Sequence, residues 1–429
     1  MSDMLSRHGR IVTYNASITI LYFEDFLPPW PFWRESCNSV VMIANPIRND
    51  PQVGQDYYAA LDGFRGLLAV FVAIYHTIWV SHPQTWRFFE NGPVIIDLFF
   101  AFSGFLMWRL YSNRLQTTDQ AKAFMKRRFA RLYPLHLFMT LVFLAFAIAR
   151  VVAHQVGLAD QTVGEILPFQ PGASENWFSL IQNLTMTNAL GFSDSLTYNP
   201  TSWTVGAEFC TYIVFAVMMM WFRPKRTLHF IAILAGICLI YGALSRIEPN
   251  MNITYDYGFW RCVAGFYTGV LAAVCFPKIR HFIQGLSVFE ASLLECLVLA
   301  ASIAFVILVP GKGQFTVGAF IFVFVVVFAS DKGAVSKFMS QRIFQYLAKI
   351  SYSVYLIHVI ISIAFSICLT RIFGELPTGW EGDFWLGVYL CVVIAASHCT
   401  YHLIEKPGGR FIRNWNRPRK RVAEAGPSV

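Results

Sequence analysis

Long apolar runs alternate with short polar segments over most of this chain. Each run has about the length that one helix needs to cross a bilayer, roughly 20 mostly apolar residues. Because backbone groups in lipid must be hydrogen-bonded within their own segment, the runs predict helices. We expect ten membrane spans, at residues 64–81, 93–111, 135–155, 203–222, 227–244, 258–276, 287–309, 315–330, 351–370 and 384–403. The predicted fold class is therefore all-α, a multi-pass transmembrane helical bundle.

The segments outside these runs divide the chain further. Residues 1–56 mix Pro, Trp and charges and lack the long apolar centre of a signal peptide. They predict either a flexible cytoplasmic lead or a start-site artefact, with Met42 as the true start. A membrane domain then covers residues 57–407 and a basic cytoplasmic tail covers 408–429. In the longest polar loop, residues 156–202, we expect a short surface helix at Trp177–Leu190.

Basic residues gather in every second loop, which sets the direction of the spans. These loops and the tail contain Lys122, Lys126, Arg127, Arg128 and Arg131, then Arg223, Lys225 and Arg226, then Lys278 and Arg280, then Lys332, Lys337 and Arg342, then Arg413, Arg417, Arg419, Lys420 and Arg421. Loops rich in Lys and Arg stay in the cytoplasm, so both termini are predicted to be cytoplasmic.

Composition agrees with a membrane protein. The 429 residues are 56% hydrophobic and 14% charged, whereas soluble domains carry about 25% charged residues. The net charge of +9 lies in short loops and not on a soluble basic face, so no nucleic-acid partner is expected. The nine cysteines are scattered, without metal-ligand spacing, and are expected to pack as small apolar residues.

Two ionisable residues in the first predicted span carry the chemical hypothesis. Arg65 and His76 are eleven residues apart, which is about 16 Å and three turns along one helical face. A guanidinium at the membrane surface can hold phosphate, and an imidazole deeper in the membrane can take a proton from a hydroxyl. The spacing suits an elongated anionic donor. The alternative is an interfacial anchor at Arg65 and a buried, hydrogen-bonded histidine at His76.

Six motifs follow one another in an order that resembles the acyltransferase 3 family of integral membrane acyltransferases. They are Leu61-Asp62-Gly63-Phe64-Arg65-Gly66 with His76; Asp97-Leu98-Phe99-Phe100 with Ser103-Gly104-Phe105; Arg128, Arg131, Tyr133 and Pro134; Ser202-Trp203-Thr204 with Glu208; Ser351-Tyr352-Ser353 with Tyr355 and His358; and Glu405-Lys406-Pro407.

The resemblance implies an activity and roles for residues of this chain. It implies transfer of an acyl group, acetyl above all, from acyl-CoA on the cytoplasmic side to a carbohydrate or glycolipid hydroxyl. It also implies a bacterial inner-membrane location. His76 takes the family's catalytic histidine role, as general base or acyl relay, and Arg65 is its partner. Arg128 and Arg131 are implied to bind the donor, although loops facing anionic headgroups carry the same residues.

Further polar residues lie in or near the later spans. Glu208 could orient a histidine or hold sugar hydroxyls, and we count it with the catalytic residues. Tyr355 and His358 share a helical face with Ser351, and either bind the donor or acceptor or join helices by hydrogen bonds. For the charges Asp97, Arg109 and Arg261 we expect partners inside the bundle.

The last predicted span ends in a group of three ionisable residues. His398 and His402 have the i, i+4 spacing of a metal site, and Glu405 follows. Without a zincin-like Glu between the histidines we expect no metal. Glu405 is instead expected to form an ion pair near Lys406 and Arg410.

Two other function classes fit the composition. A transporter or exporter of a glycan or small metabolite would also have many spans and intramembrane charges, but it should show symmetry between two halves, which this sequence lacks. A receptor or scaffold without catalysis would leave the Arg65–His76 spacing unexplained.

Overall fold

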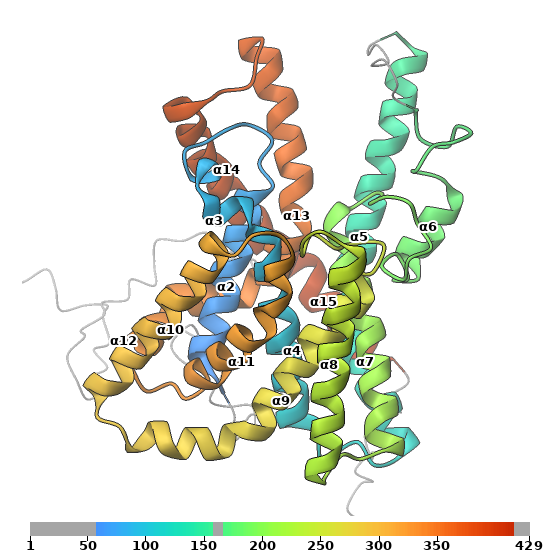
Figure 1. Cartoon of the computed structure of the whole chain (residues 1–429). Helices are drawn as coiled ribbons and strands as arrows, with labels where there is room; N and C mark the ends of the chain where they lie inside the picture. Colours follow the sequence, from blue (N-terminus) through green and yellow to red (C-terminus); the bar gives the residue numbers. More distant parts are fainter. Residues whose placement is uncertain (1–56, 158–165, 416–429) are drawn as a thin grey trace, which may run out of the picture. The chain divides into compact units, whose positions relative to one another are not determined.

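The computed structural model describes residues 57–157 and 166–415. The predicted lead at 1–56 and residues 416–429 of the predicted tail lie outside the described residues. The regular secondary structure of the described part is helical, apart from one isolated bridge between Val80 and Thr378. Its α-helices are α2 (Ala59–Tyr75), α3 (Arg87–Glu90), α4 (Ile96–Tyr111), α5 (Thr118–Gln155), α6 (Trp177–Leu184), α7 (Trp203–Trp221), α8 (Thr227–Ile247), α9 (Gly258–Gly285), α10 (Val288–Leu308), α11 (Val317–Phe328), α12 (Ala334–Met339), α13 (Arg342–Phe373), α14 (Gly379–Thr400) and α15 (Lys406–Asn414) (Figure 1).

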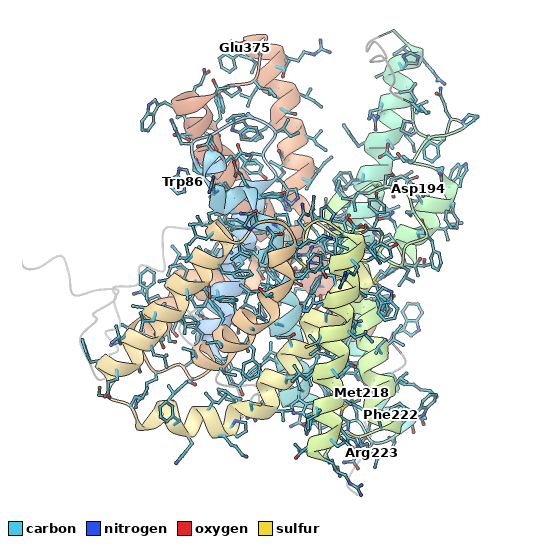
Figure 2. All side chains as sticks on the ribbon, viewed as in Figure 1. Trp86, Asp194, Met218, Phe222, Arg223 and Glu375 are labelled. Atoms are coloured by element: carbon cyan, nitrogen blue, oxygen red, sulfur yellow. The ribbon has the colours of Figure 1, made fainter. Side chains whose placement is uncertain are left out.

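The all-α, multi-pass class is confirmed. Within the described residues, nine helical segments are long and apolar enough to cross a membrane, and they coincide with the second to tenth predicted spans. Figure 2 places Arg223 at one end of the bundle and Trp86, Asp194 and Glu375 toward the other. Alternate loops therefore emerge at opposite ends, as predicted; the cytoplasmic assignment of one end stays a prediction.

The first predicted span is wrong at both ends. Helix α2 has 17 residues, or about 26 Å at 1.5 Å per residue, and it ends before His76. At its beginning the Asp331 carboxylate accepts hydrogen bonds from the N–H groups of Ala59 and Ala60, at 3.2 and 2.9 Å. At its end the chain turns away and is held by Trp79, whose indole N–H donates to Gly382 O at 3.1 Å. Contacts with distant loops set these limits, so hydropathy could not reveal them.

Small residues allow helices α4 and α9 to approach closely. A Cβ atom added at Gly104 would lie 1.8 Å from Phe266 O, and one at Gly269 would lie 1.9 Å from Ala101 O. Only glycine fits such a crossing, which is the usual role of small residues between membrane helices.

The same two helices share a buried ion pair. Arg261 Nη2 lies 2.6 Å from Asp97 Oδ2, and both side chains are almost fully buried. The expectation that these two charges pair inside the bundle is confirmed. Arg109 also has a partner, since its Nε donates to Tyr58 OH at 2.8 Å.

Helix α2 fits against α12 and α13 in the same way. A Cβ atom at Gly63 would lie 2.2 Å from Met339 O, and one at Gly66 would lie 2.5 Å from Ala348 N. The glycines on both sides of Arg65 are therefore packing residues, and they allow the N-terminal half of α2 to approach α12 and α13 closely.

The basic segment before the third predicted span is part of one long helix. Pro134 lies inside α5, which continues through it to Gln155. Two glycines of α15 pack here: a Cβ atom at Gly408 would lie 2.5 Å from Pro134 Cβ, and one at Gly409 would lie 2.7 Å from Ala130 O. The segment directly after the Glu405-Lys406-Pro407 motif therefore packs against the basic part of α5.

The predicted surface helix is also shorter than expected. Helix α6 ends at Leu184, and not at residue 190. Met186, two residues later, has a φ of +57°, in the left-handed region that ends helices.

Candidate active site

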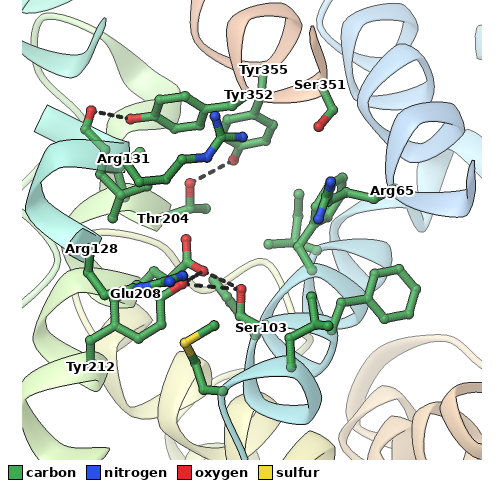
Figure 3. Close-up of a pocket in the computed structure, with 18 residues that line it drawn as sticks. Arg65, Ser103, Arg128, Arg131, Thr204, Glu208, Tyr212, Ser351, Tyr352 and Tyr355 are labelled. Carbon is green, nitrogen blue, oxygen red and sulfur yellow. Dashed lines mark hydrogen bonds between the residues drawn. The ribbon is translucent and has the colours of Figure 1, made fainter. Parts of the chain in front are cut away.

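A cavity of about 170 Å³ lies between α2, α4, α5, α7 and α13 (Figure 3). It brings together five of the predicted site residues, Arg65, Arg128, Arg131, Glu208 and Tyr355. Ile96 and Met107 of α4 both line it, and eleven residues of helix correspond to about 16 Å. The cavity is therefore narrow and elongated, with apolar walls between its polar groups.

Two arginines in the lining of this cavity each have a buried donor without a partner. The Nε atoms of Arg65 and Arg128 are buried and have no hydrogen-bond partner. Arg65 Nη2 lies 2.9 Å from Asp62 Oδ1, and the Arg128 guanidinium lies over the rings of Tyr111 and Tyr212. A buried donor without a partner costs about 1–3 kcal/mol. A ligand with anionic oxygens would supply the missing acceptors.

Arg131 differs from Arg128 because its charge is already paired. It forms an ion pair with Glu405, which is almost completely buried, in the π-helical turn η6 (Tyr401–Glu405). The other carboxylate oxygen of Glu405 accepts a hydrogen bond from Ser353 Oγ at 2.7 Å. The expected structural ion pair of Glu405 is therefore confirmed, but its partner is not the nearby Lys406 or Arg410. The partner lies on α5, 274 positions earlier.

Glu208 is held in place by two neighbours that the sequence reasoning missed. Its Oε1 accepts hydrogen bonds from Ser103 of α4 and from Tyr212, one turn later on α7. In Figure 3 the second carboxylate oxygen has no hydrogen bond to the residues drawn. Tyr212 lies four residues after Glu208, a spacing that could have indicated it. Ser103 comes from another helix, and only its place in a motif marked it.

Tyr355 lines the cavity and also contacts His358. Its hydroxyl accepts a hydrogen bond from Thr204 Oγ1 at 3.0 Å, and its ring lies 6.1 Å from that of Phe99. On its other side the His358 ring lies 6.0 Å away. Tyr355 therefore stands between the cavity and the histidines.

The two predicted site histidines meet outside this cavity. His358 Nε2 lies 3.3 Å from His76 Nδ1, and the ring centroids are 5.0 Å apart. His358 is completely buried, whereas His76 is half-buried at the end of α2. The structure thus separates the predicted site into an arginine- and glutamate-lined cavity and a histidine pair, with Tyr355 between them.

The histidines near the end of α14 do not form a metal centre with Glu405. Tyr346 OH lies 2.7 Å from His398 Nδ1, and Glu405 is directed to Arg131. Among residues 57–157 and 166–415, no group of three His, Cys, Asp or Glu side chains is placed to hold a metal ion.

Comparison with known sequences agrees with the motif order. Residues 58–401 match the family described as acyltransferase domain. The chain belongs to this family. It is therefore a multi-pass membrane acyltransferase, and its reaction needs an acyl donor as co-substrate.

Three relatives illustrate the range of the similarity. The chain is 28% identical to "Protein 2 in picA locus" of Rhizobium radiobacter, over 43% of this chain and 95% of that protein. It is 31% identical to acyltransferase MdmB of Streptomyces mycarofaciens, over 32% of this chain and 30% of that protein. It is 22% identical to O-acetyltransferase OatA of Staphylococcus aureus, over 70% of this chain and 50% of that protein. The chain thus spans half or less of the length of the two relatives named as acyltransferases. No solved structure matches the chain significantly.

Proposed function

We propose that this acyltransferase moves an acetyl group from acetyl-CoA to a hydroxyl of a carbohydrate or glycoconjugate. The observation that carries the proposal is the elongated cavity, whose lining includes Arg65 and Arg128, each with a buried Nε that has no hydrogen-bond partner. The name of the Staphylococcus aureus relative, an O-acetyltransferase, supports transfer to oxygen. We place the enzyme in a bacterial inner membrane with both termini in the cytoplasm.

The donor is proposed to enter from the end that carries the basic loops. Phosphate groups of CoA suit the unused donors of Arg65 and Arg128, because arginine binds phosphate oxygens through several N–H groups at once. The thin, largely uncharged pantetheine arm suits a narrow cavity with apolar walls. Arg131 contributes mainly by holding α5, η6 and α13 together, since Glu405 already neutralises it.

The acyl end of the donor is then directed toward His76. It must pass Tyr355, which lines the cavity and whose ring lies 6.0 Å from that of His358. In the proposed reaction His76 takes the proton of the acceptor hydroxyl while the oxygen attacks the thioester carbonyl. The tetrahedral intermediate collapses to the ester and releases the CoA thiolate, which takes up the proton that His76 received from the acceptor hydroxyl.

Glu208 is proposed to orient the reactants. Ser103 and Tyr212 fix one carboxylate oxygen, which leaves the other as an acceptor for an amide N–H of the donor or a hydroxyl of the sugar. Such a preorganised acceptor favours a single pose of the bound molecule.

Acetyl transfer by a His76→Ala variant tests this proposal. The variant should appear in the membrane at the wild-type level and lose roughly 10²- to 10⁴-fold in rate, the usual contribution of a general base. His281→Ala removes an exposed histidine at the end of α9 and is the matched control, with wild-type activity expected. The measurements are the O-acetyl content of cellular glycans and radiolabel transfer from acetyl-CoA in isolated membranes. Wild-type O-acetylation by His76→Ala would overturn the proposal.

A further inference from the structure

We propose that His358 is the positioning residue of His76: it accepts a hydrogen bond from His76 Nδ1–H and thereby fixes Nε2 of His76 as the base. This inference rests on the proposed function. It replaces the expectation that His358 contacts the donor, because this side chain lies against His76 and is not in the lining of the cavity.

The proton position on His76 follows from its neighbours. Its Nδ1 lies 2.9 Å from Val72 O. A carbonyl oxygen can only accept, so this nitrogen carries the proton in the neutral ring, and Nε2 keeps its lone pair. The tautomer needed for general-base catalysis at Nε2 is therefore already present.

The same reasoning applies to His358. Its Nδ1 lies 3.1 Å from Val354 O, so Nδ1 is again the donor and Nε2 the acceptor. That Nε2 lies 3.3 Å from His76 Nδ1. The His76 Nδ1 proton is consequently shared between two acceptors, Val72 O and His358 Nε2.

This arrangement has the geometry of a base with an orienting partner. In serine hydrolases a carboxylate accepts the Nδ1–H bond and holds the imidazole in the productive tautomer. Here a neutral imidazole occupies that place, and among the described residues no carboxylate is hydrogen-bonded to either ring. When His76 takes up a proton its Nδ1–H becomes a charged donor, and both of its hydrogen bonds strengthen.

The backbone around the pair is fixed by further hydrogen bonds. Ser362 Oγ of α13 donates to His76 O at 3.0 Å. Tyr389 OH of α14 lies 3.2 Å from Ala73 O and 3.1 Å from His358 O. Three helices thus hold the two rings at one separation, as a preorganised catalytic pair requires.

Three substitutions of His358 separate hydrogen-bond acceptance from other roles. The side-chain oxygen of His358→Gln can occupy the position of the histidine Nε2, so this variant should keep most of the wild-type kcat. In His358→Asn the amide is too short to reach His76, and His358→Leu has no acceptor. Both should lose roughly tenfold or more in kcat, as expected for loss of a hydrogen bond that fixes the base, while the KM for acetyl-CoA stays unchanged. Rates are taken per amount of folded, monodisperse enzyme in detergent.

His136→Gln is the matched control. His136 is also buried and bonded to a carbonyl, with Nε2 2.7 Å from Asn183 O, but it does not line the cavity. Its substitution should leave kcat per folded enzyme unchanged. Combining His76→Ala with His358→Leu should be no worse than His76→Ala alone, because the partner acts only through His76.

Each outcome decides the point. A raised KM with unchanged kcat, a Gln variant as slow as the Leu variant, or an added loss in the double variant would overturn the positioning role. If His76→Ala is inactive and the His358 variants keep their kcat, only this inference fails. If His76→Ala is fully active, the proposed function fails first.

Discussion

Asp97 belongs to a family-like motif, yet its surroundings predict a role in stability. Its carboxylate accepts hydrogen bonds from Arg261 Nε at 2.9 Å and Nη2 at 2.6 Å, and from Tyr241 OH at 3.3 Å. Both charges are fully buried, with exposed fractions of 0% for Asp97 and 1% for Arg261. In Asp97→Ala the guanidinium would remain in the bundle with only the carbonyls of Ile253 and Pro93 as partners.

The expected cost of this change is large. Removing one partner of a buried ion pair costs about 3–5 kcal/mol, because the other charge stays buried without compensation. Proteins are typically stable by only about 5–15 kcal/mol. Asp97→Ala should therefore greatly reduce the yield of folded protein and lower its free energy of unfolding in detergent.

Two variants serve as controls. Asp62→Ala removes the partner of a half-buried pair and should cost at most about 1 kcal/mol. The double variant Asp97→Leu with Arg261→Met removes both buried charges and should recover much of the loss, since such replacements are often neutral or stabilising. If Asp97→Ala unfolds like the wild type but has lost acyl transfer, the reasoning is refuted and Asp97 acts in the chemistry.

Three further predictions test other parts of the structure. Gly104→Ala puts a methyl group 1.8 Å from a carbonyl oxygen of α9 and should prevent folding, whereas Gly236→Ala, with open space around it, should not lower stability; yields of monodisperse protein measure both. Arg128→Ala should weaken acetyl-CoA binding without lowering the unfolding midpoint. Arg131→Ala leaves a buried carboxylate without its ion-pair partner and should lower the midpoint. Equal midpoints for the two variants would contradict the assignment of Arg128 to binding and Arg131 to stability. Desolvation raises the pKa of Asp331 to about 6, so the folded state binds this proton more tightly than the unfolded state does. The free energy of unfolding should therefore fall as the pH rises from about 4 to 6. Asp331→Asn should flatten this pH dependence when unfolding is measured as a function of pH.

The amino-acid sequence was enough for the class of fold and the class of enzyme. Apolar runs of membrane-spanning length identify helices because hydrogen bonding within each helix is local and the bilayer demands it. The alternation of basic loops predicted that successive loops emerge at opposite ends of the bundle, as they do; which end is cytoplasmic stays a prediction. Motif order pointed to the family that residues 58–401 match, and it singled out Arg65, Arg128, Glu208 and Tyr355, which the structure gathers around one cavity.

Only the tertiary structure decided which of these side chains act on one another. His76 and His358 are 282 positions apart, and Arg131 and Glu405 are 274 apart, so no local pattern links either pair. The end of α2 before His76 depends on contacts such as that of Trp79 with Gly382. Hydropathy shows which segments are apolar enough to cross the bilayer. Which helices become neighbours depends instead on how glycines, prolines and buried charges allow the helices to pack.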